Sequence, residues 1–258
     1  MGIVDLFRNK SNQEDPSQES FETVLRKAAS EPAYRPEFYK RLLTENLIVL
    51  TDGKTLPEGI STLEEDTSIN IASFPDGKIP LFTSVPKIFE KGINTEHIPY
   101  LEMKGADIFV MAKGATFILN PYSDFGKELL PQEIENLLNG TIFTDTHKKL
   151  TIKKESEIRI GQPAEYPTEI VNSLKILFQT KSSVKAAYLG FIHDPSTEEP
   201  PHLIFAIDAD ADQMQDIVNE AGFTARQFLK ADEIVDFIRI DMSGLSEYFL
   251  QTEPFYKK

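Results

Sequence analysis

The apolar residues between positions 21 and 50 first recur at helical spacing and then run together. Apolar side chains three or four residues apart predict a helix that starts at Phe21 and is stopped by Pro32. A second helix is predicted after Pro36, and the apolar run 46–50 that follows indicates a buried strand. This stretch therefore predicts two helices that lead into a sheet.

The next stretch replaces this spacing with short apolar runs separated by turn residues. Residues 54–68 are polar and predict an exposed loop. The runs 68–74 and 79–83 flank a Pro-Asp-Gly-Lys turn, which favours a hairpin. A second hairpin is predicted from the runs 106–112 and 115–120, which flank Lys-Gly.

Helices are predicted around these hairpins. Residues 86–91 suit a short helix for which Ser84 is available as a cap, and residues 96–103 suit another. The amphipathic run that ends at Gly140 predicts a longer helix.

A polar stretch rich in Lys and Thr follows this helix and separates two apolar regions. We therefore predict a flexible N-terminal tail at 1–18, an α+β domain at 19–145, a linker at 146–155 and a second α+β domain at 156–258.

The second region orders its elements as strand, helix, strand, strand, helix, strand. The expected elements are strands at 156–161, 184–193, 202–208 and 234–241, helices capped by Thr168 and ending near Gly222, and a last helix at 244–250. This order is compatible with a ferredoxin-like layer in which two helices cover one face of the sheet. Order alone does not fix strand pairing, so other pairings stay open.

Composition indicates a folded, acidic protein. Of its 258 residues, 40% are hydrophobic and 18 are Phe, which is enough to fill two cores. The formal net charge of −14 repels polyanions, which disfavours nucleic-acid binding, and attracts cationic partners. Acidity is also a common solubility feature, and this is the favoured explanation.

Residue usage and apolar run lengths also bear on location. The chain contains no Cys, which excludes disulfides, thiolate nucleophiles and zinc–thiolate sites. No apolar run is long enough to span a bilayer, and the N-terminus lacks a signal-peptide pattern. Leu6 stands where myristoylation of Gly2 requires Ser or Thr, although the apolar residues 3–7 could contact a membrane or a partner. We expect a cytoplasmic protein without a membrane span.

Motifs for catalysis and cofactor binding are missing. The 13 glycines include no Gly-x-Gly pair and no complete P-loop pattern, so these nucleotide-binding fingerprints are absent. The Gly-x-Ser-x-Gly elbow of many esterases and the His-Glu-x-x-His pattern of metalloproteases are absent too. We expect no cofactor, and a binding protein is favoured over an enzyme.

The acidic run after residue 207 has the start of a calcium-binding pattern. Asp208, Asp210 and Asp212 occupy the first three ligand positions of an EF-hand loop. Gln213 stands where that loop needs Gly, and Asn219 stands where it needs a closing Glu. The favoured interpretation is that an Asp caps the following helix, and no metal site is expected.

Two other groups of polar residues carry weaker chemical hypotheses. His193, Asp194 and His202 flank one connection and could meet to hold a metal or relay a proton, although the Pro- and Glu-rich loop between them favours solvated histidines. The basic stretch 147–154 could meet a phosphate or an acidic surface, but a solvated linker is the favoured explanation.

Thr83, Ser84 and Asn120 are the candidate ligand-binding residues. They follow two predicted strands, whose ends could offer hydroxyl, amide and backbone groups to the charged ends of an amino acid. The favoured alternative is structural, with Ser84 capping a short helix and Asn120 turning the chain.

Five segments gain meaning from their order and spacing. They are "NLIVLTDG", "IPLFTSVPKIFE", "ATFILNPYSDFGKELLPQEIENLL", "IRIGQPAEYPTEIVNSLKILFQTKSSVKAAYLGFI" and "HLIFAIDADADQMQDIV". Together they resemble the SseB family, bacterial proteins named after an enhanced serine-sensitivity phenotype. Related domains also resemble components of toxin-immunity neighbourhoods. The resemblance implies a two-domain protein that binds a protein partner and has no assigned catalytic residues. A small-molecule sensor or enzyme of amino-acid metabolism is the alternative.

Overall fold

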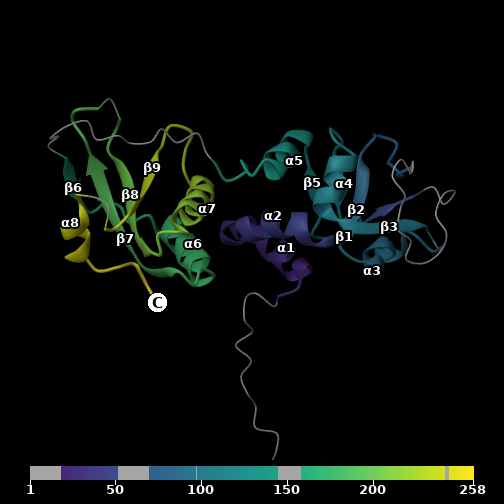
Figure 1. The fold of residues 1–258 in the computed structure, drawn as a ribbon, viewed down its shortest axis with the longest axis horizontal. Coiled ribbons are helices and arrows are strands. Elements are labelled where there is room, and N and C mark those ends of the chain that lie inside the picture. The colour runs from purple at the N-terminus through teal and green to yellow at the C-terminus, as the bar shows by residue number, and fades with distance from the viewer. Residues whose placement is uncertain (1–18, 52–69, 97, 145–157, 198, 242–243) are drawn as a thin grey trace, which may run out of the picture.

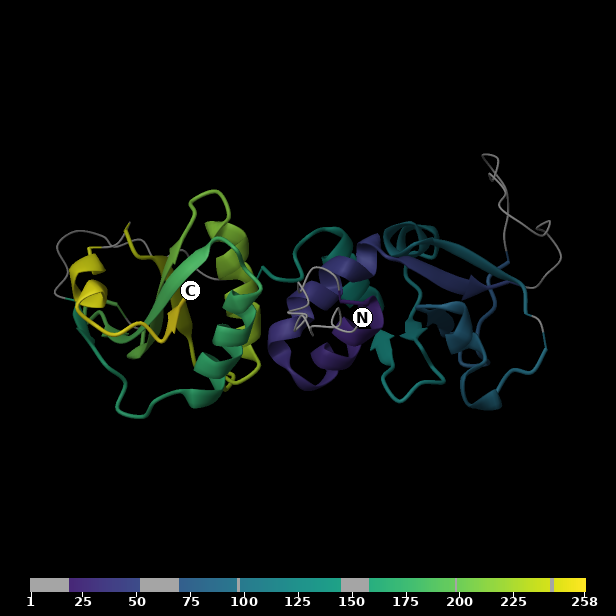
Figure 2. The same cartoon turned by 90° about the horizontal axis from the view of Figure 1, so that it is seen from below.

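The computed structural model contains two five-stranded sheets, one in each half of the chain, and each sheet has helices on both faces (Figures 1 and 2). This arrangement confirms the predicted α+β class. The predicted tail and linker lie outside the described residues, so the domain boundaries stay a prediction. The described residues are 19–51, 70–96, 98–144, 158–197, 199–241 and 244–258. We call residues 19–144 the N-terminal half and residues 158–258 the C-terminal half.

The N-terminal half combines a mixed sheet with helices. Its helices are α1 (Phe21–Ser30), η2 (Pro32–Tyr34), α2 (Arg35–Thr44), α3 (Val85–Ile88), η3 (Glu90–Gly92), α4 (Gly105–Met111) and α5 (Pro131–Leu138). Its strands are β1 (Asn46–Leu50), β2 (Ile79–Phe82), β3 (Tyr100–Lys104), β4 (Phe117–Leu119) and β5 (Lys127–Leu129). The strand order is β3-β1-β2-β4-β5. Strands β2 and β4 are parallel and the other neighbours are antiparallel, so β2 and β4 end at the same edge.

Strand β1 packs against a separate core on each face of this sheet. Leu47 and Val49 join the core formed with α1, α2, α4 and α5. Ile48 and Leu50 face the opposite core, which includes Ile88 of α3. This division follows from the alternation of side chains along a strand. It confirms the strand predicted at 46–50.

Both predicted hairpins are wrong. Residues 70–74 contribute a single bridge, between Ile71 and Thr51, and β2 pairs with β1 and β4 instead. The predicted turn does form, because Gly77 adopts a φ of 83° and the Phe74 N–H donates to the Lys78 carbonyl at 2.8 Å. A turn sequence therefore fixes the local conformation without deciding which strand becomes the neighbour.

The run 106–112 forms most of helix α4 rather than a strand, and residues 100–104 form β3 rather than a helix. Gly105 allows α4 to approach α2, since a Cβ at this position would lie 1.9 Å from the Leu42 carbonyl oxygen. Ile108 and Phe109 of this helix then fill the core, whereas Val110 and Met111 are exposed. A short apolar run fits a buried strand or a buried helix, and this packing decides between them.

The C-terminal half follows the predicted order of elements and adds a short strand at the end. Its helices are α6 (Thr168–Gln179), α7 (Met214–Arg226) and α8 (Ser246–Leu250). Its strands are β6 (Arg159–Gly161), β7 (Val184–His193), β8 (His202–Ala209), β9 (Val235–Arg239) and β10 (Tyr256–Lys257). The strand order is β10-β7-β8-β9, and β6 also pairs with β7.

The strand pairing is not ferredoxin-like. Strand β6 pairs directly with β7 in antiparallel fashion, and β8 pairs with β9 in parallel. A ferredoxin-like sheet instead inserts its third strand between the first two. Helices α6 and α7 do cover one face, as predicted. Phe205 and Ile207 of β8 join their core, whereas Ile204 and Ala206 face Phe249 of α8.

Two helix boundaries differ from the prediction. Helix α7 continues through Gly222 to Arg226, because Gly222 is buried inside the helix rather than placed at its end. Thr168 is the first residue of α6 and not its cap, since Pro167 occupies the cap position.

Helices of the two halves meet, with α1 and α2 facing α6 and α7 (Figures 1 and 2). The Phe223 ring of α7 packs edge to face against Tyr39 and Phe143, with centroid distances of 6.0 and 5.4 Å. Ala33 of η2 is buried in the core of the C-terminal half. Apolar packing therefore joins the two halves.

A buried charge lies at the same junction. The Glu220 side chain of α7 is 3% exposed and pairs with Lys40 of α2 and with Lys181, which follows α6. The Lys181 Nζ lies 2.5 Å from Glu220 Oε2, and this contact is ionic rather than a well-aligned hydrogen bond. One carboxylate thus holds a lysine from each half.

Candidate functional site

Thr83 and Asn120 follow the parallel strands β2 and β4 and meet at the edge where both strands end. Asn120 Oδ1 accepts a hydrogen bond from the Thr83 N–H at 3.0 Å, and Asn120 Nδ2 donates to Thr83 Oγ1 at 3.0 Å. The hydroxyls of Thr83 and Ser84 both donate to Glu22 Oε1 at 2.8 Å. The structure therefore brings the three predicted residues together and adds Glu22 of α1. We call these four residues the strand-end cluster.

Asn120 is fixed by its backbone as well as by its amide. Its φ of 48° is a left-handed conformation that Asn adopts more readily than most residues, and the residue is 2% exposed. Its N–H donates to the Leu81 carbonyl at 2.7 Å, and its own carbonyl accepts from the Ser123 N–H at 3.0 Å. Asn120 therefore turns the chain after β4 while its side chain ties this turn to the end of β2.

Ser84 does not act as a helix cap. It occupies the N-cap position of α3, but no helix N–H donates to its hydroxyl. The hydroxyl donates to the Glu22 carboxylate instead, and bonds to a charged acceptor are stronger than bonds between neutral groups. The structural role that the sequence favoured for Ser84 is therefore wrong.

Charged side chains of both signs surround the strand-end cluster. The Lys87 Nζ lies 3.8 Å from Glu22 Oε2 and 3.0 Å from Glu90 Oε2. Ser123 also donates to Glu90, and this bond together with Lys87 holds the pKa of the Glu90 carboxyl below its ordinary value. Adjacent positive and negative groups suit a ligand that carries both charges.

Sequence reasoning missed Glu22 because it lies 61 positions before Thr83. In the sequence it is one acidic residue in the first turn of an amphipathic helix. Acidic residues are common there because they interact favourably with the helix dipole. The pairing with Thr83 and Ser84 arises from the packing of α1 against the sheet, and no local sequence pattern predicts it.

The three aspartates near residue 210 do not form the predicted helix cap. Asp210 pairs with Lys185 at 3.0 Å, and Gln213 occupies the N-cap position of α7 without a side-chain bond to the helix. Among the residues that the structure describes, no group of three or more His, Cys, Asp or Glu side chains is arranged to hold a metal.

His202 pairs with Asp236 of β9 rather than with His193 or Asp194. Its Nε2 lies 3.0 Å from Asp236 Oδ2, and its Nδ1 lies 2.8 Å from the Pro200 carbonyl oxygen. Burial opposes a charge on His202, but the bonds to Asp236 and Pro200 raise the pKa of its imidazole above the ordinary value. Asp194 bonds within its own turn. The His-Asp-His alternative therefore does not form, and the favoured interpretation of solvated histidines is wrong for His202, which is buried.

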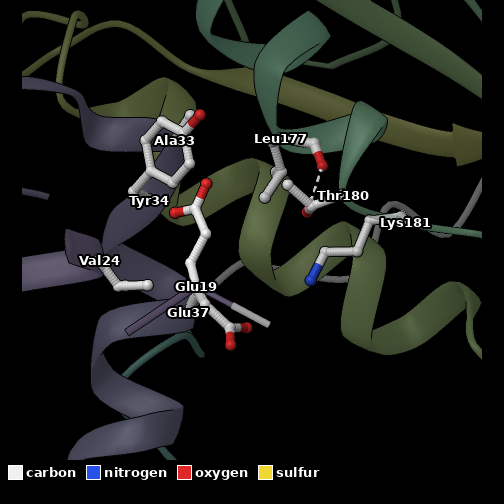
Figure 3. A pocket seen from close by; sticks show the side chains of 8 residues that line it. All are labelled: Glu19, Val24, Ala33, Tyr34, Glu37, Leu177, Thr180 and Lys181. Carbon is white, nitrogen blue, oxygen red and sulfur yellow. Dashed lines mark hydrogen bonds between the residues drawn. The ribbon is translucent and has the colours of Figure 1, made fainter. Parts of the chain in front are cut away.

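A cleft of about 150 Å³ lies between the two halves (Figure 3). Figure 3 shows the side chains of the N-terminal half facing those of the C-terminal half across the gap. The first wall consists of Glu19, Val24, Ala33, Tyr34 and Glu37. The second wall consists of Leu177, Thr180 and Lys181. No sequence motif identified the residues that line this cleft, because its walls come from α1, η2, α2 and the end of α6.

The cleft has an apolar floor and a charged rim. Val24, Ala33 and Leu177 are buried apolar residues, whereas Glu37 is exposed. The Glu19 Oε1 lies 2.5 Å from Lys27 Nζ. Among the described residues, Glu37 forms no ion pair or side-chain hydrogen bond.

Two remaining sequence predictions concern surfaces. The basic stretch 147–154 and the apolar residues 3–7 lie outside the described residues. Within the described part of the chain, no helix has both the length and the apolar character needed to cross a bilayer.

Two protein-family models match this chain in succession. The model described as SseB protein N-terminal domain matches residues 21–136, and the model described as SseB protein C-terminal domain matches residues 152–258. Protein SseB of Escherichia coli (strain K12) is 29% identical over 249 residues, which cover 94% of this chain and 93% of that protein. Protein SseB of Shigella flexneri has the same identity and coverage. No solved structure matches.

Proposed function

The chain belongs to the SseB family, and from this premise we propose that it is a non-catalytic cytoplasmic interaction or regulatory protein. The cleft between the two halves is the observation that carries this proposal. It combines buried apolar side chains with an unpaired carboxylate, which is the composition that recognition sites commonly show. A link to serine tolerance or toxin immunity is the biological setting that we propose.

The charge of the protein indicates the kind of partner. A net charge of −14 accelerates the approach of a basic protein and repels an acidic one. Glu19 and Glu37 place two acidic side chains at the cleft itself. A partner with a basic surface therefore fits best.

Affinity capture with a matched pair of variants tests this proposal. Thr180 is exposed at the cleft, so Thr180→Phe fills part of the cleft, whereas Gln179→Phe adds the same ring next to it. We expect mass spectrometry to find a partner retained by the wild type and Gln179→Phe but lost with Thr180→Phe. The purified partner must then bind directly. Turnover of a hydrolase or transferase substrate that a single substitution abolishes would refute the proposal.

The strand-end cluster favours a second candidate function, a small-molecule sensor or enzyme of amino-acid metabolism. Ligands of open sheets with parallel strands bind beyond the carboxyl ends of those strands, which is where Thr83, Ser84 and Asn120 lie. Glu22 and Lys87 would pair with the ammonium and carboxylate groups of an amino acid. At present the members of the cluster satisfy one another, so a ligand must replace existing bonds.

Thermal-shift measurements with millimolar serine and related amino acids test this second candidate. A specific ligand raises the melting temperature of the wild type by mass action, and Glu22→Gln reduces this shift because it removes the negative charge. Glu135→Gln on α5 is the control, since this exposed residue lies outside the cluster. The absence of a shift with every amino acid rejects the candidate.

A further inference from the structure

The cleft between the halves has the size and composition of a pocket for one amphipathic side chain. Its volume is about 150 Å³. An apolar cavity of about this volume accepts benzene, and a lysine side chain is of comparable size. The buried residues Val24, Ala33 and Leu177 supply apolar surface for an aliphatic stem.

The charges at the cleft leave one carboxylate available. The Lys27 ammonium lies 2.5 Å from Glu19 and 4.8 Å from the centroid of the Tyr34 ring. The Lys181 ammonium lies 2.5 Å from Glu220. Lys181, which lines the cleft, and Lys27, which lies beside Glu19, therefore each already have a carboxylate partner.

Glu37 differs from these paired groups. It lines the cleft, and among the described residues it has neither an ion pair nor a side-chain hydrogen bond. An incoming ammonium group would gain this carboxylate without displacing a lysine. An incoming carboxylate would meet Glu19 and Glu37, and a neutral apolar group would leave Glu37 unpaired.

We propose that this cleft receives a lysine side chain presented by a partner protein, with its aliphatic stem on Val24, Ala33 and Leu177 and its ammonium group at Glu37. Lysine fits a cleft of this volume better than arginine, because its ammonium group is compact, whereas the guanidinium of arginine is a larger planar group. This inference rests on the proposed binding function and specifies the chemistry of its partner.

Titration of isotope-labelled protein with butylammonium chloride, followed by NMR, tests the pocket directly. Butylammonium reproduces the stem and charge of lysine. We expect saturable shifts at the amides of Ala33, Thr180 and Lys181, with a dissociation constant on the order of millimolar for so small a ligand. 1-Butanol and butyrate, at the same concentrations and ionic strength, should bind at least about tenfold more weakly because they lack the positive charge.

Variants separate this pocket from unspecific attraction to an acidic surface. Glu37→Gln should weaken butylammonium binding about five- to tenfold, and Thr180→Phe should abolish it. Glu135→Gln and Gln179→Phe are the matched controls and should bind as the wild type does. Equal binding of butanol, unchanged binding by Glu37→Gln, or shifts confined to other surfaces would overturn the inference.

A second arm tests whether the lysine belongs to a protein. Nα-Acetyl-lysine N-methylamide, whose side-chain ammonium is free, should bind at least as tightly as butylammonium. The corresponding norleucine compound, which lacks the ammonium group, should not bind. If the lysine compound does not bind, the ligand of the cleft is not a lysine side chain of a protein. If a captured partner requires the cleft but butylammonium does not bind, the proposed function stands and the lysine pocket is wrong.

Discussion

Asn120 performs two tasks that few residues combine. Its backbone adopts a φ of 48°, and its amide makes two hydrogen bonds with Thr83 across the ends of β2 and β4. Glycine adopts this backbone conformation readily but has no amide side chain. Most polar residues neither adopt the conformation easily nor offer both a donor and an acceptor. The sequence allowed a turn at Asn120 to be predicted, but the partner of its amide became visible through the parallel pairing of β2 with β4.

Substitution of Asn120 separates these two tasks. We expect Asn120→Ala to lower the free energy of unfolding by about 2–3 kcal/mol, since it removes both side-chain bonds and places Ala in a left-handed conformation. Asn120→Gly should recover about 1 kcal/mol of this loss. Urea denaturation measures both values. Equal stability of the two variants would show that the backbone conformation contributes nothing.

His202 makes stability depend on pH. Both ring nitrogens face acceptors, Asp236 Oδ2 and the Pro200 carbonyl, so the folded state favours the doubly protonated ring. Burial lowers the pKa of His202, but these bonds and the charges of Asp236 and Glu199 raise it overall. A raised folded-state pKa gives stability that is fully present below the unfolded value of about 6.5 and is lost as pH rises through the folded value.

A comparison of the wild type with His202→Gln tests whether the stability contributed by His202 falls as pH rises. Below pH 6 we expect the wild type to be more stable by about 1–2 kcal/mol, because the variant loses a charged hydrogen bond. The difference in the free energy of unfolding should narrow as pH rises toward 8.5. A difference that stays constant or widens with pH would contradict the protonated assignment.

At the scale of elements, long amphipathic patterns predicted helices well, whereas short apolar runs did not distinguish a strand from a helix: the run 46–50 forms β1 and the run 106–112 forms most of α4. Helices α1, α2 and α6 match their predictions closely because their buried residues repeat along several turns, and strand β7 matches because it is a long, largely apolar run. The run 106–112 lacks such a repeat, so its helix depends on a close approach to α2. Strand β5 was missed because three residues carry too little pattern.

Gly105 provides a test of that close approach. Gly105→Ala places a Cβ against the Leu42 carbonyl oxygen, a backbone atom that cannot move aside as a side chain could. We expect a loss of about 3 kcal/mol in the free energy of unfolding. Gly161→Ala in β6 is the matched control, because a Cβ there meets nothing within 4 Å and should change stability by less than about 0.5 kcal/mol. Similar effects of the two substitutions would contradict the packing argument.

At the scale of the whole molecule, the junction between the halves determines the cleft. Its parts lie far apart in the chain, from Glu19 to Lys181, and none belongs to a recognisable motif. Composition predicted an acidic protein with attraction for cationic partners, but it did not indicate where such a partner would bind. That location depends on how the helices of the two halves pack.

Glu220 holds this junction through Lys40 and Lys181. We expect Glu220→Gln to lower the free energy of unfolding by about 3 kcal/mol, because it leaves two lysines beside a buried neutral group. Asp210→Asn removes the exposed ion pair with Lys185 and should cost far less, because solvent screens this pair. Chemical denaturation of both variants measures the contrast. Equal losses would show that burial of Glu220 contributes nothing.

Calorimetric titration with the captured, purified partner measures whether the cleft is its binding site. We expect Thr180→Phe to raise the dissociation constant at least about tenfold, which corresponds to about 1.4 kcal/mol, while Gln179→Phe binds as the wild type does. Equal affinity of the wild type and Thr180→Phe would contradict the claim, because the partner would then bind elsewhere on the protein.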